Sequence, residues 1–283
     1  MLIRRPDDRG WYLYYEQYPG VQYGMSTAET LEGPWWHFYV KRLGIPEGAR
    51  HGCMVQISKD ELDGLVAHFG ITGESQWESV TDDGGAHARH ESSFVEAGGR
   101  LFLLGGRRIQ PVDIYDPESG LWTTGQPPPI ELHHFQAVSY RGLVYVLAAM
   151  TGKYPGETPT ERVHIYDPAK DEWRLGAEIP EDRRRGSAGV VVFGDRFYVV
   201  SGITDGHRSG WVPWLDVFDP ETGKWTPLPD APRARDHFHA AVVGGKIYAA
   251  GGRRSGSSKP VFAGTVEEVD VFDIETGRWH TLP

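Results

Sequence analysis

The chain has 283 residues, of which 39% are hydrophobic, 24% charged and 12% aromatic, and its formal net charge is -10. This composition is typical of a folded globular protein with one large all-β domain or two smaller domains. No apolar run is long enough to span a bilayer, and the acidic balance argues against nonspecific binding of nucleic acid, which needs a basic footprint. We therefore expect neither a membrane nor a nucleic acid as partner.

The first residues, MLIRRPDDRG, turn polar at once and lack the apolar stretch of a secretory signal. For the sequence as written we expect a cytoplasmic protein, whereas a start further upstream could carry an export signal. Cys53 is the one cysteine, which excludes an internal disulfide and a multi-cysteine zinc site.

Residues 1–70 are predicted to form an N-terminal β unit. Two aromatic-rich segments, 11–18 and 21–27, have strand composition, and a Gly-Pro turn leads into a third strand at Trp35. Apolar residues at helical spacing predict a short helix over 59–69, and the Gly, Ser and Asp content of 71–86 predicts a linker.

The segments YGMSTAETLEGPW and ARHGCMVQISKDEL lie within residues 10–69, after the aromatic strand. Together they resemble a late blade of the five-bladed propellers of family-43-like glycoside hydrolases. The carboxylates that cleave sugars in such enzymes lie on other blades and have no match here. The resemblance therefore implies a β blade and not the hydrolase activity.

An internal repeat occupies the rest of the chain. Four segments share one ending: VDIYDPESGLW, VHIYDPAKDEW, LDVFDPETGKW and VDVFDIETGRW. Their final tryptophans, Trp122, Trp173, Trp225 and Trp279, are spaced by 51, 52 and 54 residues. In most of these endings an alternating strand runs into Asp-Pro, a turn initiator, and a glycine allows positive φ before the next strand. Each ending predicts a β-hairpin.

A second shared unit precedes each hairpin: FVEAGGRLFLLGG, AVSYRGLVYVLAA, VVVFGDRFYVVSG and AVVGGKIYAAGG. Each predicts a strand, a short polar turn, a second strand and a pair of small residues. One repeat is thus four strands in about fifty residues, which must stack against its neighbours to bury both faces.

The period, the small-residue pair, the aromatic residue before Asp and the Trp together resemble the kelch repeat. The resemblance implies an all-β, kelch-type β-propeller with four four-stranded blades, at residues 87–129, 130–180, 181–230 and 231–283. The glycine pair is replaced by Ala148 and Ala149 in the second repeat and by Ser201 and Gly202 in the third. Kelch propellers usually have six or seven blades, so we expect a fragment that lacks further blades, an open arc completed by a partner, or the product of a rearranged gene.

Charged residues recur in register before the innermost strand of each repeat, where they would collect around one mouth of a propeller. We predict a ligand-binding ring from these columns, with additional residues from the loops after the small-residue pair. The candidates are Arg89, His90, Glu91, His133, His134, Arg184, Arg185, Arg235, Asp236, His237 and His239, with Arg107, Arg253 and Trp211 from the loops. The alternative is that these side chains bond neighbouring blades to one another.

Three functions are compatible with this ring. Arginine forks and a stacking Trp211 favour an acidic carbohydrate or another small anionic ligand. An enzyme of the sugar mutarotase or epimerase type, also built on kelch blades, would need a proton-transfer group, for which Glu91 and His134 are the candidates. The third function is a protein-interaction scaffold whose loops dock a partner.

Alternation along a strand would place His237 and His239 on one face, where a His-x-His pair can chelate a metal. With His133 and His134 on another blade a metal ring is conceivable, but no specific pattern supplies the remaining ligands, so we predict no metal and no cofactor. Copper oxidases of the galactose-oxidase type share the kelch fold but need a tyrosine linked to a nearby cysteine, and Cys53 lies outside the repeats.

Overall fold

The computed structural model describes residues 2–4, 9–17, 22–30, 34–38, 85–256 and 264–282. The chain forms two units, Met1–Thr81 and Asp82–Pro283, which are described separately. The helix predicted over 59–69, Cys53 and most of the predicted linker lie outside the described residues.

The first unit contains one antiparallel four-stranded sheet, which confirms the prediction of an N-terminal β unit. Its strands pair in the order β1-β2-β3-β4. They are β1 (Leu2–Arg4), β2 (Trp11–Gln17), β3 (Gln22–Ala28) and β4 (Trp36–Phe38).

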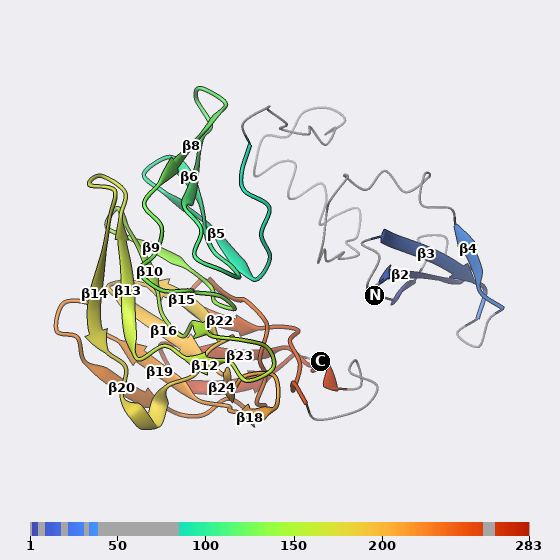
Figure 1. The fold of residues 1–283 in the computed structure, drawn as a ribbon. Coiled ribbons are helices and arrows are strands. Elements are labelled where there is room, and N and C mark those ends of the chain that lie inside the picture. Colours follow the sequence, from blue (N-terminus) through green and yellow to red (C-terminus); the bar gives the residue numbers. More distant parts are fainter. Residues whose placement is uncertain are drawn as a thin grey trace. The chain divides into compact units, whose positions relative to one another are not determined.

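The second unit consists of four antiparallel four-stranded blades that follow one another in chain order (Figure 1). Blade 1 contains β5 (Ser92–Ala97), β6 (Arg100–Gly105), β7 (Val112–Asp116) and β8 (Leu121–Gly125). Blade 2 contains β9 (Val138–Tyr140), β10 (Leu143–Val146), β13 (Arg162–Asp167) and β14 (Glu172–Glu178). Blade 3 contains β15 (Gly189–Phe193), β16 (Arg196–Val200), β19 (Leu215–Phe218) and β20 (Trp225–Leu228). Blade 4 contains β21 (Ala240–Val243), β22 (Lys246–Ala249), β23 (Asp270–Asp273) and β24 (Arg278–Thr281).

Smaller elements fill the connections. Two short ribbons lie in loops, β11 (Met150–Thr151) with β12 (Thr158–Pro159), and β17 (Ile203–Asp205) with β18 (Ser209–Trp211). One turn of 3-10 helix spans Glu181–Arg183. Within the described ranges no helix is long and apolar enough to cross a bilayer. The predicted all-β propeller of four blades is confirmed.

The outer hairpin of each blade has the same construction. The aromatic residue before Asp lies opposite the final tryptophan, as in Tyr115 with Trp122 and Phe218 with Trp225. The ring centroids of the four aromatic pairs are 5.1, 5.2, 4.7 and 5.1 Å apart in blades 1 to 4. The aspartate that follows accepts backbone hydrogen bonds within the turn, for example from Glu118 to Asp116 at 2.8 Å. The shared sequence ending is therefore a turn fixed by a carboxylate and closed by two contacting, tilted aromatic rings.

The small-residue pair ends the second strand in a left-handed conformation. Gly105 has φ 72° and Gly251 has φ 68°, and Ala148 and Ser201 keep this conformation with φ 49° and 55°. A Cβ atom on the second glycine, Gly106, would lie 2.8 Å from the carbonyl oxygen of His90. The pair thus lets the chain turn close to the innermost strand.

The core consists of three hydrophobic clusters, one between each pair of consecutive blades. We call the face that a blade turns to the following blade its leading face, and the opposite face its trailing face. The leading faces of blades 1 to 3 are buried, as Leu104, Leu147 and Val200 show with 0% exposure each. Dispersion contacts and burial of apolar area on both sides of each blade hold the array together.

The two end faces of the array lack such a neighbour within the described part of the chain. On the leading face of blade 4, Val243 is 65% exposed and Ala250 is exposed. On the trailing face of blade 1, Phe94 is 55% exposed, whereas its equivalents Ala137 and Val190 in blades 2 and 3 are buried. The two ends therefore present faces of the same kind as those that pack inside the array.

Candidate functional site

The site is built on a repeated backbone feature. Glu91, His134, Ser187 and His237 occupy the same position in the four repeats, and all have left-handed φ between 51° and 61°. They are joined in series: the N–H groups of His134, Ser187 and His237 donate to the carbonyl oxygens of Glu91, His134 and Ser187 at 2.9, 2.9 and 3.0 Å. Left-handed backbone is uncommon for residues other than glycine. Its fourfold recurrence brings this column of side chains together at the centre of the array.

Gln136 links the inner strands around this centre. Its Oε1 atom accepts from the backbone N–H groups of Val190 and Ala240, both at 2.9 Å, and its Nε2 atom donates to the carbonyl of Ala240 at 2.9 Å. One side chain from blade 2 thus fixes blades 3 and 4, which keeps the central side chains in register.

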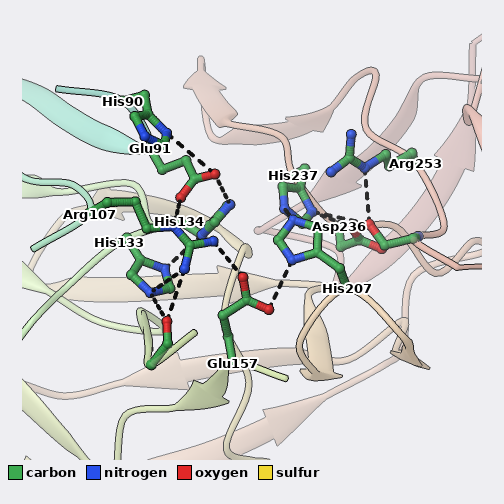
Figure 2. Close-up of polar contacts among 12 residues, drawn as sticks. His90, Glu91, Arg107, His133, His134, Glu157, His207, Asp236, His237 and Arg253 are labelled. Carbon is green, nitrogen blue, oxygen red and sulfur yellow. Dashed lines mark hydrogen bonds and ion pairs between the residues drawn. The ribbon is translucent and has the colours of Figure 1, made fainter. Parts of the chain in front are cut away.

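A network of charge surrounds the centre (Figure 2). Arg107 forms short contacts with Glu91 and Glu157 and donates to the carbonyl of Gly152 at 2.9 Å. The Nε2 atom of His134 lies 3.1 Å from Oε1 of Glu91. Burial opposes ionisation of Glu91, but hydrogen bonds from His134 and Arg107 outweigh it and hold its pKa well below the usual range. Glu91 is therefore an ionised carboxylate.

Two adjacent histidines, His133 and His134, contact each other through their Nδ1 atoms at 2.7 Å. Burial lowers the pKa of both residues to about 4. The Nε2 atom of His133 lies 3.1 Å from the carbonyl oxygen of Gly152, an acceptor, and 3.3 Å from Nη1 of Arg107, a donor. The predicted proton-transfer pair, Glu91 and His134, is thus brought into contact by the fold.

Two residues that the sequence analysis did not single out complete the centre. Glu157 lies in the loop between β11 and β12 and is 1% exposed, and His207 lies between β17 and β18. The Nδ1 atom of His207 is 3.1 Å from Oε2 of Glu157, and its Nε2 atom is 3.0 Å from Nε2 of His237. The available signal was their place in the long connections between the second and third strands, which also carry the exposed Tyr154 and Trp211.

Three predicted ligand-binding arginines lie inside the blades. Arg89, Arg185 and Arg235 form ion pairs with Asp113, Asp216 and Asp270 on the third strand of their own blade. The nitrogen–oxygen distances are 2.7 Å for Arg185 and 2.6 Å for Arg235. Their side chains are at most 1% exposed, so they have no surface to offer a ligand. These arginines fasten the segment before the first strand to the third strand of the same blade, whereas the alternative interpretation placed such bonds between neighbouring blades.

Blade 2 replaces this pair by Leu132 and His164, and both residues are buried. Burial lowers the pKa of His164, and its Nδ1 atom has no hydrogen-bond partner among the described residues. The sequence already shows this exchange. In the second repeat, Leu132 stands where the other repeats have arginine, and His164 stands where they have Asp113, Asp216 and Asp270.

We expect His164 to make the protein sensitive to acid. The unfolded chain binds a proton at His164 near pH 6.5, whereas the folded chain resists it, so stability falls as the pH drops below about 6.5. Substitution His164→Leu is expected to shrink the fall in melting temperature between about pH 7.5 and about pH 5. The control is His90→Leu at an exposed site; an equal effect of the two variants would contradict the expectation.

The remaining predicted site residues lie away from the centre or at its edge. Arg184 pairs with Glu161 at 3.1 Å, and Arg253 donates to Ser255 at 3.0 Å. His90 is exposed with its Nδ1 atom 3.6 Å from Glu91. His239 is exposed and does not share a face with His237, because the left-handed His237 precedes the strand, which begins at Ala240. Trp211 is 39% exposed, with the guanidinium of Arg254 5.5 Å above its ring.

Four antiparallel blades, each packed on the next and joined at their inner ends, define a β-propeller array of sequence repeats. Residues 184–232 and 234–283, which correspond to blades 3 and 4, match the Kelch motif. Together with the relatives described next, this match supports the assignment of the chain to the kelch-repeat family.

The chain is similar to several curated kelch-like proteins. It is 30% identical over 221 residues to Kelch-like protein terF of Aspergillus terreus, covering 72% of this chain and 46% of that protein. It is 27% identical over 194 residues to Kelch-like protein 40 of Xenopus laevis, covering 68% and 30%, respectively. It is 35% identical over 124 residues to human Kelch-like protein 23, covering 43% of this chain and 20% of that protein. The chain spans less than half the length of each of these relatives. The resemblance of residues 10–69 to a glycoside hydrolase blade has no support in these comparisons and stays a prediction.

Proposed function

We propose that the second unit (Asp82–Pro283), which we call the kelch unit, is a protein-interaction module that binds its partner through the loops joining the second and third strands of its blades. The observation that carries this proposal is a pair of exposed aromatic residues on neighbouring loops, Tyr154 at 70% and Trp211 at 39% exposure. Rigid aromatic side chains that protrude from a fixed scaffold are the type of residue that dominates binding energy at protein interfaces.

The loops of blades 2 and 3 form one continuous surface. The backbone N–H of His207 donates to the carbonyl of Pro155 at 3.0 Å, and the ring of Tyr154 lies 5.0 Å from that of His207. Buried Glu157 bonds to His207 beneath them at 3.1 Å. Because these contacts fix both loops, the aromatic anchors lose little freedom when a partner binds.

Charge on this surface indicates the chemistry of the partner. Lys153 and Arg208 are exposed beside the two aromatic residues, and Arg108 and Ile109 are exposed on the equivalent loop of blade 1. Basic and apolar groups together favour a protein segment that carries acidic and apolar side chains. An acidic sugar, the alternative ligand, would have to bind without Arg89, Arg185 and Arg235, since these are held inside the blades.

The test is selection of short peptides by phage display on the immobilised protein, followed by affinity measurements. We expect peptides with acidic and apolar residues to be enriched, and Tyr154→Ala and Trp211→Ala each to weaken their binding by about 30-fold. Leu121→Ala, at an exposed position on β8, is the control and should bind as the unmodified protein does.

Two outcomes would contradict the proposal. One is selection of peptides whose binding is unaffected by either aromatic substitution. The other is binding of acidic oligosaccharides on a glycan array with no peptide enriched, which would favour the carbohydrate function and, with turnover of the sugar, the enzyme.

A further inference from the structure

Three histidines from three blades converge at the centre of the array (Figure 2). His134 comes from blade 2, His207 from the β17–β18 turn of blade 3 and His237 from the approach to β21 of blade 4. The ring centroids are 4.9 Å apart for His134 and His207, 4.8 Å for His134 and His237, and 4.6 Å for His207 and His237. One nitrogen of each ring lies within 4.8 Å of the others. The protein-interaction surface does not account for this arrangement.

The proton positions on two of these rings follow from their partners. The Nδ1 atom of His207 contacts Glu157, and the Nδ1 atom of His237 contacts Asp236. Glu157 pairs with the Arg107 guanidinium, and Asp236 accepts from the backbone N–H and the hydroxyl of Ser255, so both carboxylates act as acceptors. In both histidines Nδ1 therefore donates, and Nε2 carries a lone pair.

Those two lone pairs face each other. The Nε2 atoms of His207 and His237 are 3.0 Å apart, a hydrogen-bond distance between two acceptors when both rings are neutral. Such a contact is repulsive unless a cation, either an extra proton or a metal ion, lies between the nitrogens. In a tetrahedral zinc site with Zn–N bonds of about 2.0–2.1 Å, the nitrogens of two ligands are about 3.3 Å apart. The observed spacing is close to that of two ligands of one metal ion.

The carboxylates behind the two rings are themselves fixed. Asp236 is buried and accepts hydrogen bonds from the backbone N–H of Ser255 at 2.9 Å and from its hydroxyl at 2.6 Å. Glu157 is held by Arg107. A carboxylate bound to the distal nitrogen of a histidine is the usual support of a metal ligand, because it fixes the tautomer and the ring orientation.

The third histidine is oriented by its own contacts. The Nδ1 atom of His134 faces the Nδ1 atom of His133 at 2.7 Å, and its Nε2 atom faces the Glu91 carboxylate at 3.1 Å. A proton on Nε2 of His134 and one on Nδ1 of His133, whose Nε2 then accepts from Arg107 at 3.3 Å, satisfy both contacts. The hydroxyl of Ser187, which stands between His134 and His237 in the backbone series, is buried without a hydrogen-bond partner among the described residues. Among these contacts, the one between His207 and His237 therefore needs a cation.

We propose that His134, His207 and His237 bind a divalent transition-metal ion at the centre of the blade array, with Asp236 and Glu157 as the carboxylates that orient two of the ligands. Neutral imidazole nitrogens suit Zn²⁺, Fe²⁺, Co²⁺, Ni²⁺ and Cu²⁺, and exclude Ca²⁺ and Mg²⁺, which prefer oxygen. His207 and His237 already have the required spacing, and a rotation of the His134 side chain brings in the third nitrogen. The ion would join three blades through one point.

The experiment uses the full chain, stripped with a chelator and dialysed. Zn²⁺ binding is measured by equilibrium dialysis with elemental analysis, and Co²⁺ is added separately to read the coordination from its visible absorption. We expect one Zn²⁺ per chain, a visible Co²⁺ spectrum of nitrogen ligands, and a rise in melting temperature on Zn²⁺ addition. His207→Ala is expected to weaken Zn²⁺ binding by about 100-fold or more, since a direct ligand is lost.

His239→Ala is the matched control, because His239 is an exposed histidine two residues from His237 and outside the cluster. It should retain Zn²⁺ binding and the Co²⁺ spectrum. Circular dichroism of His207→Ala, whose side chain lies in a turn and is 14% exposed, checks that the blades are intact. Failure of the stripped protein to bind Zn²⁺ and Co²⁺, or equal binding by His207→Ala and His239→Ala, would overturn the proposal and leave an extra shared proton as the explanation of the 3.0 Å contact.

Discussion

Replacing Asp216 by alanine is expected to lower the free energy of unfolding of the kelch unit by about 3–5 kcal/mol. Asp216 is 0% exposed and pairs with Arg183 at 3.0 Å and with Arg185 at 2.7 Å. Burial lowers the pKa of Arg185 to about 10 against the opposing effect of Asp216, yet this group stays charged at neutral pH. Without the carboxylate, the buried guanidinium keeps its desolvation cost and loses its counter-ion.

The measurement is urea denaturation, with hydrogen exchange of β15 and β16 to isolate blade 3. Glu178→Ala is the control, because its pair with Arg162 is exposed, at 73% and 41%, and contributes little. The double variant Arg185→Leu with Asp216→His carries the residues of blade 2 and should recover part of the loss. A change below about 1 kcal/mol in Asp216→Ala would show that the pair does not hold the blade.

A charged side chain introduced at equivalent positions of blades 3 and 4 is expected to change the stability of the protein by very different amounts. Val191, on the leading face of blade 3, is 4% exposed and packs in the cluster that joins blades 3 and 4. Substitution Val191→Asp places an unpaired carboxylate in that cluster and should cost about 4 kcal/mol or more. Ala241 holds the same place in blade 4 and is exposed, so Ala241→Asp should change stability by about 0.5 kcal/mol or less.

Thermal unfolding and hydrogen exchange of β15, β16, β21 and β22 would test this pair of variants. Equal destabilisation by both substitutions would mean that the leading face of blade 4 is covered in solution. Light scattering on the Ala241→Asp variant and the unmodified protein would then tell whether a second copy provides the cover.

The repeat carries most of the information about the fold. The strand pattern, the Asp turn and the final tryptophan recur with so little variation that they predict the four blades, and the rings of Tyr166 and Trp173 lie 5.2 Å apart as that pattern requires. The short strands β11, β12, β17 and β18 were not predicted, because they lie in the connections between second and third strands, whose length and sequence differ from repeat to repeat.

The candidate site was predictable where it follows the repeat. Counting back from the small-residue pair places Glu91, His134 and His237 in one column, and the fold brings their side chains to one centre. Glu157 and His207 cannot be found by this counting, because their positions depend on the path of individual loops. The column also cannot tell which neighbours face inward: Arg235 and His237 are two residues apart, yet one lies in its blade beside Asp270 and the other faces His207.

Each blade carries one indole at the end of its outer hairpin, in contact with a Tyr or Phe ring. Trp173 donates its Nε1 hydrogen to Gln126 at 2.9 Å, and Trp279 donates to Pro229 at 2.8 Å, so these rings also bond to the chain segment that leads in from the preceding blade. Every repeat thus contains a tryptophan whose fluorescence can report on the packing of its own blade. Because, among the described residues, the end blades have a packed neighbour on one side only, melting should proceed inward from both ends, and the environments of Trp122 and Trp279 should change before those of Trp173 and Trp225.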